Sequence, residues 1–223
     1  SLAAIAARSG NGIWTVEIIP AEIQPPARSV AGASGIRIRI GSKRVTNGGD
    51  QTDLVVAFNE QVLLGRVKGG ELKKGATIIL ESMWREHADP AIAASYASTV
   101  TALREGGFHL IEAPLERECR KLVADARKGK NMFVLGMLCS IYSLDLGLAR
   151  AQIALIFGKK DEKVIASNVK LMEAGFAWAE QQLDFKYRIP AAKITEPQVV
   201  VSGNTAIALG VLGMPGITGY AGL

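Results

Sequence analysis

The residues best suited to binding chemistry lie in and next to one long loop. The loop runs from Pro20 to Gly35 and carries Arg28, while Arg37 follows in the next segment. Proline stiffens its first half, and the small residues of its second half would let a ligand approach the backbone. Loops of this length in compact domains are usually functional or disordered, and this composition favours a functional loop.

A second candidate is the short string Ser202-Gly203-Asn204-Thr205, where an apolar run passes into a segment of small residues. A strand-to-helix turn of this kind can present backbone N–H groups to an anion. The plainer interpretation is a tight turn that binds nothing. The residues alone leave both interpretations open.

Metal and redox chemistry finds few ligands in this chain. Cys119 lies in a polar run and Cys139 in an apolar one, no Cys-x-x-Cys occurs, and His87 and His109 are isolated. We therefore expect no disulfide framework, iron–sulfur cluster or structural zinc within the chain. A reducing cytoplasm is the expected compartment.

The charge pattern does not indicate a nucleic-acid surface. The chain has 223 residues and a net charge of +5, but its cations are scattered, and their densest stretches lie beside glycine at the ends of predicted elements. Cations in the last turn of a helix offset its dipole, so a solvated surface explains them. The longest apolar run, 132–144, is too short to span a bilayer, and no secretory signal is visible. We expect neither nucleic acid nor a membrane as a partner.

Hydrophobic periodicity predicts an α/β fold. Residues 36–40 alternate isoleucine with arginine, and the continuous apolar runs 54–58 and 76–80 are typical of strands covered on both faces. Strands separated by helical stretches predict a mainly parallel sheet between two helical layers, a three-layer domain. Strands are expected at 14–19, 36–40, 54–58, 76–80 and 108–112, and helices at 1–10, 90–105, 130–144, 150–157 and 161–182.

Two asparagines carry specific expectations within these helices. Asn131 is placed to cap the buried helix at its start. Asn168 is a polar residue on the apolar face of the last long helix, and we expect its side chain to bond to backbone across the helix pair rather than to a ligand.

The amino-acid composition of the chain changes after a linker that begins and ends with proline. Residues 190–197 begin and end with proline, and the apolar stretch 199–211 follows as a predicted strand running into a helix. We therefore expect one domain over residues 1–190, a linker over 191–198, and the start of a second domain over 199–223. An apolar strand of this kind is expected to be buried against another domain, or to pack back on the first domain as a terminal strand.

Several strings, in order, resemble one family. The segments 21–37 and 48–59, the latter carrying an Asp-x-x-Val-Ala pattern, resemble the gamma domain of 2-oxoacid:ferredoxin oxidoreductases, and 130–136 and 157–176 look like its C-terminal helices. The segment 202–210 is similar to the opening of the pyrimidine-binding thiamine domain of the alpha subunit. A gamma domain followed by an alpha domain is the order of fused alpha subunits, as in many 2-oxoglutarate enzymes.

The resemblance implies a subunit that is inactive alone. The implied reaction is the CoA-dependent oxidative decarboxylation of a 2-oxoacid, 2-oxoglutarate to succinyl-CoA, with electrons passed to ferredoxin. It also implies thiamine diphosphate with Mg²⁺ at the interface with a beta subunit, an iron–sulfur cluster in that partner, and a dimer of alpha–beta pairs. The alternative, from another class, is a non-catalytic α/β scaffold or ligand-binding module that resembles the gamma domain.

The resemblance implies no catalytic residue and no metal ligand within this chain, but it does imply two binding regions. The gamma domain of the family closes over the path of coenzyme A, here Arg28, Ser29, Gly32, Ala33, Ser34 and Arg37, although a loop that only covers the sheet, with its arginines in water, is equally compatible. The edge of the thiamine domain would comprise Gly203, Asn204 and Tyr220. The chain departs from the family in starting inside the first helix, and its last residues match a shortened motif in which only Tyr220 corresponds.

Overall fold

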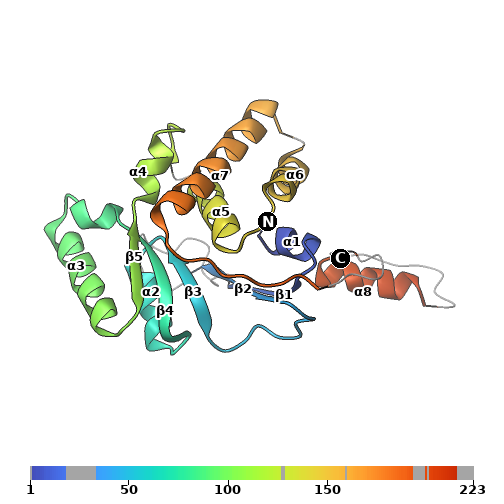
Figure 1. Ribbon diagram of the computed structural model, residues 1–223, viewed down its shortest axis with the longest axis horizontal. Helices are drawn as coiled ribbons and strands as arrows, with labels where there is room; N and C mark the ends of the chain where they lie inside the picture. The colour runs from blue at the N-terminus through green and yellow to red at the C-terminus, as the bar shows by residue number, and fades with distance from the viewer. Residues whose placement is uncertain are drawn as a thin grey trace.

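The chain folds into an α/β structure with one parallel sheet and a separate antiparallel ribbon (Figure 1). The computed structural model describes residues 2–18, 34–126, 129–158, 160–192, 199 and 201–214. Its strands are β1 Gly12–Ile18, β2 Gly35–Gly41, β3 Thr52–Ala57, β4 Leu72–Glu81 and β5 His109–Ala113. Its helices are α1 Leu2–Arg8, α2 Glu60–Lys68, the 3-10 helix η1 Met83–Glu86, α3 Pro90–Glu105, α4 Leu115–Arg120, α5 Lys130–Ile141, α6 Leu146–Phe157, α7 Glu162–Gln182 and α8 Gly203–Leu212.

The parallel sheet has the order β3-β4-β5 and is covered on both faces. Ile78 and Leu80 of β4 pack with the buried side chains of α2 and α3, whereas Ile79 between them packs against α5 and α7. This alternation follows from the two-residue period of a strand. The expected three-layer arrangement with a parallel sheet is thereby confirmed.

Strands β1 and β2 form an antiparallel ribbon, with Gly12 opposite Gly41 and Ile18 opposite Gly35. Ile38 and Ile40 turn toward a hydrophobic cluster that α1, α5, α6 and α7 complete, whereas Ile36 on the same face lies beyond it and is exposed. The ribbon is thus anchored at the end that joins the core, and its other end projects. The sequence indicated both strands, at 14–19 and 36–40, but not their antiparallel pairing.

The α5–α7 pair lies at the centre of the helical layer and separates two hydrophobic clusters. The two backbones approach closely at a pair of glycines. A methyl group added to Gly136 would lie 1.7 Å from the carbonyl oxygen of Met172, and one added to Gly175 would lie 1.9 Å from that of Phe133. Only glycine fits at both positions, so this crossing is set by the backbone itself.

Local signals fixed some helix ends and failed at others. Helix α3 has the predicted bounds, because Asp89 caps it by accepting a hydrogen bond from Ala91 N and Pro90 occupies its first position. Helix α6 begins four residues before the prediction, because Asp145 accepts a hydrogen bond from Leu148 N. The prediction that Asn131 caps α5 is wrong, since the helix already includes Lys130 and the cap position is Gly129.

Asn168 also differs from its expected role. Its Nδ2 donates to the carbonyl oxygen of Val164 at 2.7 Å, within the same helix, rather than across the helix pair. The turn of the helix places that carbonyl within reach, so no partner from another element is required. In the part of the chain that the structure describes, no helix has both the length and the apolar character needed to cross a bilayer.

The strand predicted after the linker is wrong at its described positions. Val199 and Val201 belong to neither a strand nor a helix, and they are exposed. A strand needs neighbours to satisfy its backbone, and no described strand pairs with this segment. The predicted helix does form as α8, with Ser202 as its cap, but none of its residues is buried and Ile207 is 66% exposed.

The glycine crossing gives a stability prediction. Gly136→Ala and Gly175→Ala should each lower the free energy of unfolding by about 3 kcal/mol or more, because the new methyl group would force α5 and α7 apart. Gly210→Ala in α8 is the matched control, since nothing lies within 4 Å of its added methyl. That variant should be neutral or slightly stabilising. Urea unfolding measures all three, and a crossing variant as stable as the control would contradict the close contact.

Candidate functional site

The structure describes four of the nine binding residues predicted from the sequence. Ser34 and Arg37 lie at the start of the ribbon strand β2, and Gly203 and Asn204 form the first turn of α8. The two pairs belong to separate elements. The other predicted residues lie outside the described residues: Arg28, Ser29, Gly32, Ala33 and Tyr220.

An open cleft of about 1210 Å³ lies between the ribbon and the amino ends of the parallel strands. Its walls are β2, the connection 47–51, the start of β3, the turn at Gly69 and Gly70, and the chain segment 186–189. Its basic side chains are Arg37, Arg39, Lys73, Lys186 and Arg188, and its carboxylates are Asp50 and Asp53. The cleft therefore carries more positive than negative groups.

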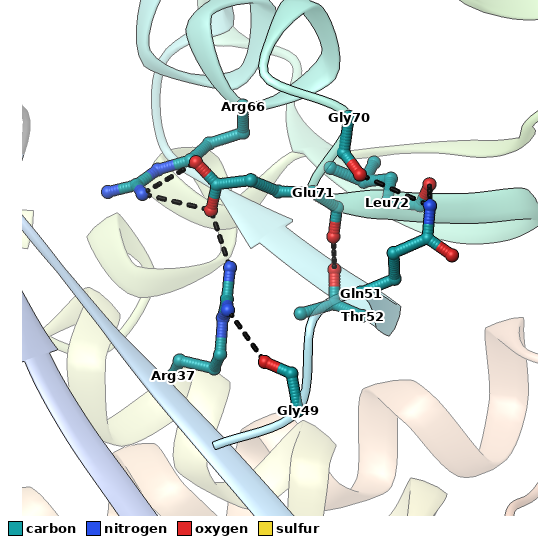
Figure 2. Close-up of polar contacts among 8 residues, drawn as sticks. All are labelled: Arg37, Gly49, Gln51, Thr52, Arg66, Gly70, Glu71 and Leu72. Carbon is teal, nitrogen blue, oxygen red and sulfur yellow. Dashed lines mark hydrogen bonds and ion pairs between the residues drawn. The ribbon is translucent and has the colours of Figure 1, made fainter. Parts of the chain in front are cut away.

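Arg37 is the predicted residue that this cleft contains, and its guanidinium is already engaged (Figure 2). One nitrogen, Nη2, lies 2.6 Å from Oε2 of Glu71, and Nη1 donates to the carbonyl oxygen of Gly49 at 3.0 Å. Arg66 of α2 binds the same carboxylate, with Nη1 3.0 Å from Oε2. Arg37 thus joins the ribbon to the parallel sheet, a role that the sequence did not indicate.

Glu71 lies directly before β4, and its backbone also contacts the first residue of β3. Its carbonyl oxygen accepts hydrogen bonds from the backbone nitrogen of Thr52 at 2.8 Å and from the Thr52 hydroxyl at 3.1 Å. The side chain of Gln51 donates to the carbonyl oxygens of Gly70 and Leu72. These bonds, drawn in Figure 2, hold the amino ends of the two strands together beside the ribbon.

The connection between β2 and β3 lies against the ribbon face that carries Trp14, Val16 and the arginines. A methyl group at Gly48 would lie 3.2 Å from Val16 and 3.7 Å from the Trp14 ring. Gly49 has a φ of 68°, which favours glycine, and it lies under the Arg39 side chain. Arg39 in turn donates to the side chain of Asn47.

The far wall of the cleft is the extended segment 183–192, which follows α7 and crosses the sheet (Figure 1). Phe185 contacts His109 edge to face, and the hydroxyl of Tyr187 lies 3.2 Å from that of Thr77. The amide of Asn11 lies within 3.4 Å of three carbonyl oxygens, those of Gly41, Ile189 and Pro190. Asn11 therefore ties this segment to the end of β2.

The carboxyl ends of the parallel strands hold a buried charge cluster that the sequence did not reveal. Glu81, the last residue of β4, is fully buried, and its Oε2 lies 3.3 Å from the ammonium of Lys130. The same ammonium lies 2.8 Å from Oε2 of Glu116. Glu81 also accepts hydrogen bonds from the backbone nitrogens of Met83 and Glu116. A carboxylate directly after the apolar run 76–80 was the one sequence signal for this cluster.

Charge and burial set the protonation of this region. The hydrogen bond from Lys130 lowers the pKa of Glu116 against the opposing effect of burial, and Arg120 lowers it further. Burial raises the pKa of the Cys119 thiol to about 11 and that of Cys139 to about 12. Both cysteines are buried free thiols. They are therefore protonated at neutral pH, which makes them poor nucleophiles.

The structure adds little support for a binding role of Gly203 and Asn204, the described residues predicted at the edge of the thiamine domain. Ser202 Oγ accepts a hydrogen bond from Thr205 N at 3.1 Å, which satisfies one N–H of the first turn of α8, and Gly203 and Asn204 are exposed. Among the described residues, no group of three His, Cys, Asp or Glu side chains is arranged to hold a metal ion.

Comparison with known proteins agrees with this architecture. The chain is a three-layer α/β domain from which an antiparallel ribbon projects. The family model for pyruvate ferredoxin/flavodoxin oxidoreductase matches residues 1–178. The chain belongs to that family. The resemblance stated from the sequence strings is thereby confirmed, and the match does not favour the alternative of a non-catalytic scaffold or ligand-binding module that resembles the gamma domain.

Individual relatives fit the same family. The chain is 29% identical to the 2-oxoglutarate oxidoreductase subunit KorA of Mycobacterium tuberculosis over 93% of its length, covering 33% of that protein. It shares the fold of a 2-oxoglutarate:ferredoxin oxidoreductase from Magnetococcus marinus, a structure solved with 2-oxoglutarate, coenzyme A and succinyl-CoA bound. The TM-score is 0.71 at 22% identity, and the match covers 95% of this chain and 33% of that one.

A gamma subunit of a keto/oxoacid ferredoxin oxidoreductase from Geobacter sulfurreducens also shares the fold. The TM-score is 0.52 at 16% identity, over 81% of this chain and 88% of that subunit. By contrast, the chain spans about a third of the KorA and Magnetococcus proteins that it matches. The similarity therefore concerns one part of those longer proteins.

The Glu71 contacts give the first prediction from the site. Glu71→Gln should lower the free energy of unfolding by about 1–2 kcal/mol, because it leaves two half-buried arginines without their carboxylate. Asp53→Asn is the matched control, since its pair with Lys73 is more exposed and should be worth about 0.5 kcal/mol or less. Chemical unfolding of both variants tests this, and equal losses would mean that the Glu71 pairs contribute no more than a surface pair.

The buried charge cluster of Glu81, Glu116 and Lys130 gives the second prediction from the site. Lys130→Met should lower stability by about 3 kcal/mol at neutral pH, because it leaves the fully buried Glu81 without a cation, while Glu116 keeps only its bond to Arg120. In the native chain the lowered pKa of Glu116 adds stability above the ordinary carboxyl pKa of about 4.3, and that stability is lost as the pH falls through the lowered value.

The deficit of the Lys130→Met variant should therefore shrink as the pH falls from 7 toward 4, because Glu116, whose pKa is lowered less without Lys130, becomes protonated. Lys121→Met removes an exposed lysine paired with Glu118 and serves as the control. Unfolding curves across this pH range provide the measurement. A deficit that is constant with pH would show that the lost interaction is packing rather than charge.

Proposed function

We propose that this chain forms part of the alpha subunit of a 2-oxoacid:ferredoxin oxidoreductase. The proposed substrate is 2-oxoglutarate, which with coenzyme A and oxidised ferredoxin would give succinyl-CoA, carbon dioxide and reduced ferredoxin. The observation that carries the proposal is the family match over residues 1–178. The 2-oxoglutarate assignment is supported by the names of KorA and of the Magnetococcus enzyme, and the cytoplasm is the proposed compartment.

The catalytic groups are proposed to lie outside this chain. Thiamine diphosphate with Mg²⁺ would stabilise the carbanion left by decarboxylation, at an interface with a beta subunit that also holds an iron–sulfur cluster. The free thiols of Cys119 and Cys139 are buried, so neither suits a cluster. In this proposal residues 1–190 form the gamma domain, 191–198 the linker and 199–223 the start of the thiamine domain, with Gly203, Asn204 and Tyr220 at its edge.

The complete enzyme is proposed to be a dimer of alpha–beta pairs. The exposed apolar side chains of the C-terminal part support burial against further protein, because Val199 and Ile207 would otherwise remain in water. A helix that is apolar around its circumference, as α8 is, normally lies in a protein interior.

The path of coenzyme A is proposed to include the six residues named from the sequence: Arg28, Ser29, Gly32, Ala33, Ser34 and Arg37. The position of Arg37 on the cleft supports this placement. Its bonds to Glu71 and Gly49 mean that Arg37 acts there mainly by holding the ribbon.

Purification of the chain with its partners from the source cell tests the proposed function. The complex should contain a second subunit and thiamine, and should reduce a viologen dye when given 2-oxoglutarate and coenzyme A, whereas the 223-residue chain alone should not. In the complex, Arg28→Ala should raise the KM for coenzyme A about tenfold and leave that for 2-oxoglutarate unchanged. A stable monomer without a co-purifying subunit or thiamine would overturn the assignment.

A further inference from the structure

We propose that the cleft between the ribbon and the segment 183–192 binds a ligand with at least two phosphate groups, through Arg39 and Arg188. This inference rests on the proposed function for its natural ligand, coenzyme A. It adds phosphate contacts on the ribbon face and the far wall of the cleft to the coenzyme A path proposed above.

The first argument is that some basic side chains of the cleft are already paired with carboxylates and others are not. Lys73 lies 2.6 Å from Asp53, Lys186 lies 2.6 Å from Glu180, and Arg37 is held by Glu71. In the residues that the structure describes, no carboxylate pairs with Arg39 or Arg188. Asp50 is the one acidic side chain in the cleft that no described cation neutralises. Arg39 donates to the neutral side chain of Asn47, which leaves its charge uncompensated. The positive charges of both arginines are therefore available to an anion at this site.

The second argument is that the fold holds these two arginines on the same cleft from distant parts of the sequence. Arg39 precedes Gly41 by two residues, and Arg188 directly precedes Ile189. The amide of Asn11 lies 3.4 Å from the carbonyl oxygen of Gly41 and 3.3 Å from that of Ile189, so it joins the two chain segments there. The bridging residue is buried, since Asn11 is 8% exposed, whereas both arginines are exposed.

The third argument is that a ligand with phosphate groups matches both the arginines and the size of the cleft. A planar guanidinium can donate two parallel hydrogen bonds to a phosphate, so arginine suits phosphate better than a point charge does. A cleft of about 1210 Å³ exceeds the range of about 300–1,000 Å³ usual for small-molecule sites, and it can take a nucleotide-sized ligand. Two separate arginines predict two separate phosphate groups rather than a single monoanion.

Equilibrium binding to the 223-residue chain tests the inference. The probes are coenzyme A and adenosine 3′,5′-bisphosphate, titrated by calorimetry into the wild type and into Arg39→Gln, Arg188→Gln and the control Lys170→Ala. Lys170 is exposed and lies outside the cleft, so its variant removes one charge elsewhere. We expect each arginine variant to weaken binding about tenfold or more, the control to bind like the wild type, and added salt to weaken binding.

The outcomes separate the inference from the proposed function. Wild-type chain that binds neither probe, or arginine variants that bind as tightly as the control, would overturn the cleft assignment. Binding that depends on both arginines would support it even if the purified complex showed no turnover, a result that would remove only the proposed function. Arg188 makes no described side-chain contact, so Arg188→Gln should keep the fold intact, and urea unfolding verifies this for every variant.

Discussion

The contact between the backbones of α5 and α7 sets the position of everything around it. Gly136 and Gly175 allow the backbone of each helix to approach the carbonyl groups of the other, so the two helices pack closely as one layer. One side of this layer carries the parallel sheet, and the other carries α1, α6 and the root of the ribbon. The segment that leaves α7 forms the far wall of the cleft, so the cleft geometry follows from the same crossing.

Polar contacts then fix the ribbon relative to the sheet, where hydrophobic packing does not reach. The apolar anchor ends near Ile38, and beyond it the ribbon depends on Arg37, whose guanidinium binds Glu71 and Gly49. A carboxylate shared by two arginines on different elements restricts orientation more than a single surface pair does. Arg37 therefore serves the site by positioning its neighbours, which explains why an arginine predicted to bind a ligand is turned into the protein.

The sequence predicted the features that depend on neighbouring residues. Helix α3 was predicted residue for residue because its cap, its proline and its following glycine are all local. The apolar runs predicted β3 and β4 and hence the three layers. The antiparallel pairing of β1 with β2, the Arg37–Glu71 pair and the Lys130–Glu81 pair join residues far apart along the chain, and no local pattern records such pairings. The predicted strand near Val199 failed for a related reason, since an apolar run specifies burial only when a partner is present.

The charged groups at the two ends of the parallel sheet differ in how completely they are paired, and this difference bears on where a ligand can bind. Open α/β sheets usually bind ligands at the carboxyl ends of their strands. Here the carboxyl end of β4 is occupied by Glu81 and Lys130, and the indole nitrogen of Trp84 donates to the carbonyl oxygen of Phe58 at the end of β3. These groups satisfy one another internally. At the amino ends, Arg39 and Arg188 face an open cleft without carboxylate partners among the described residues. Arg39 and Arg188, the described cleft arginines without a carboxylate partner, therefore lie on the amino side of the sheet, and an anionic ligand would find its partners there.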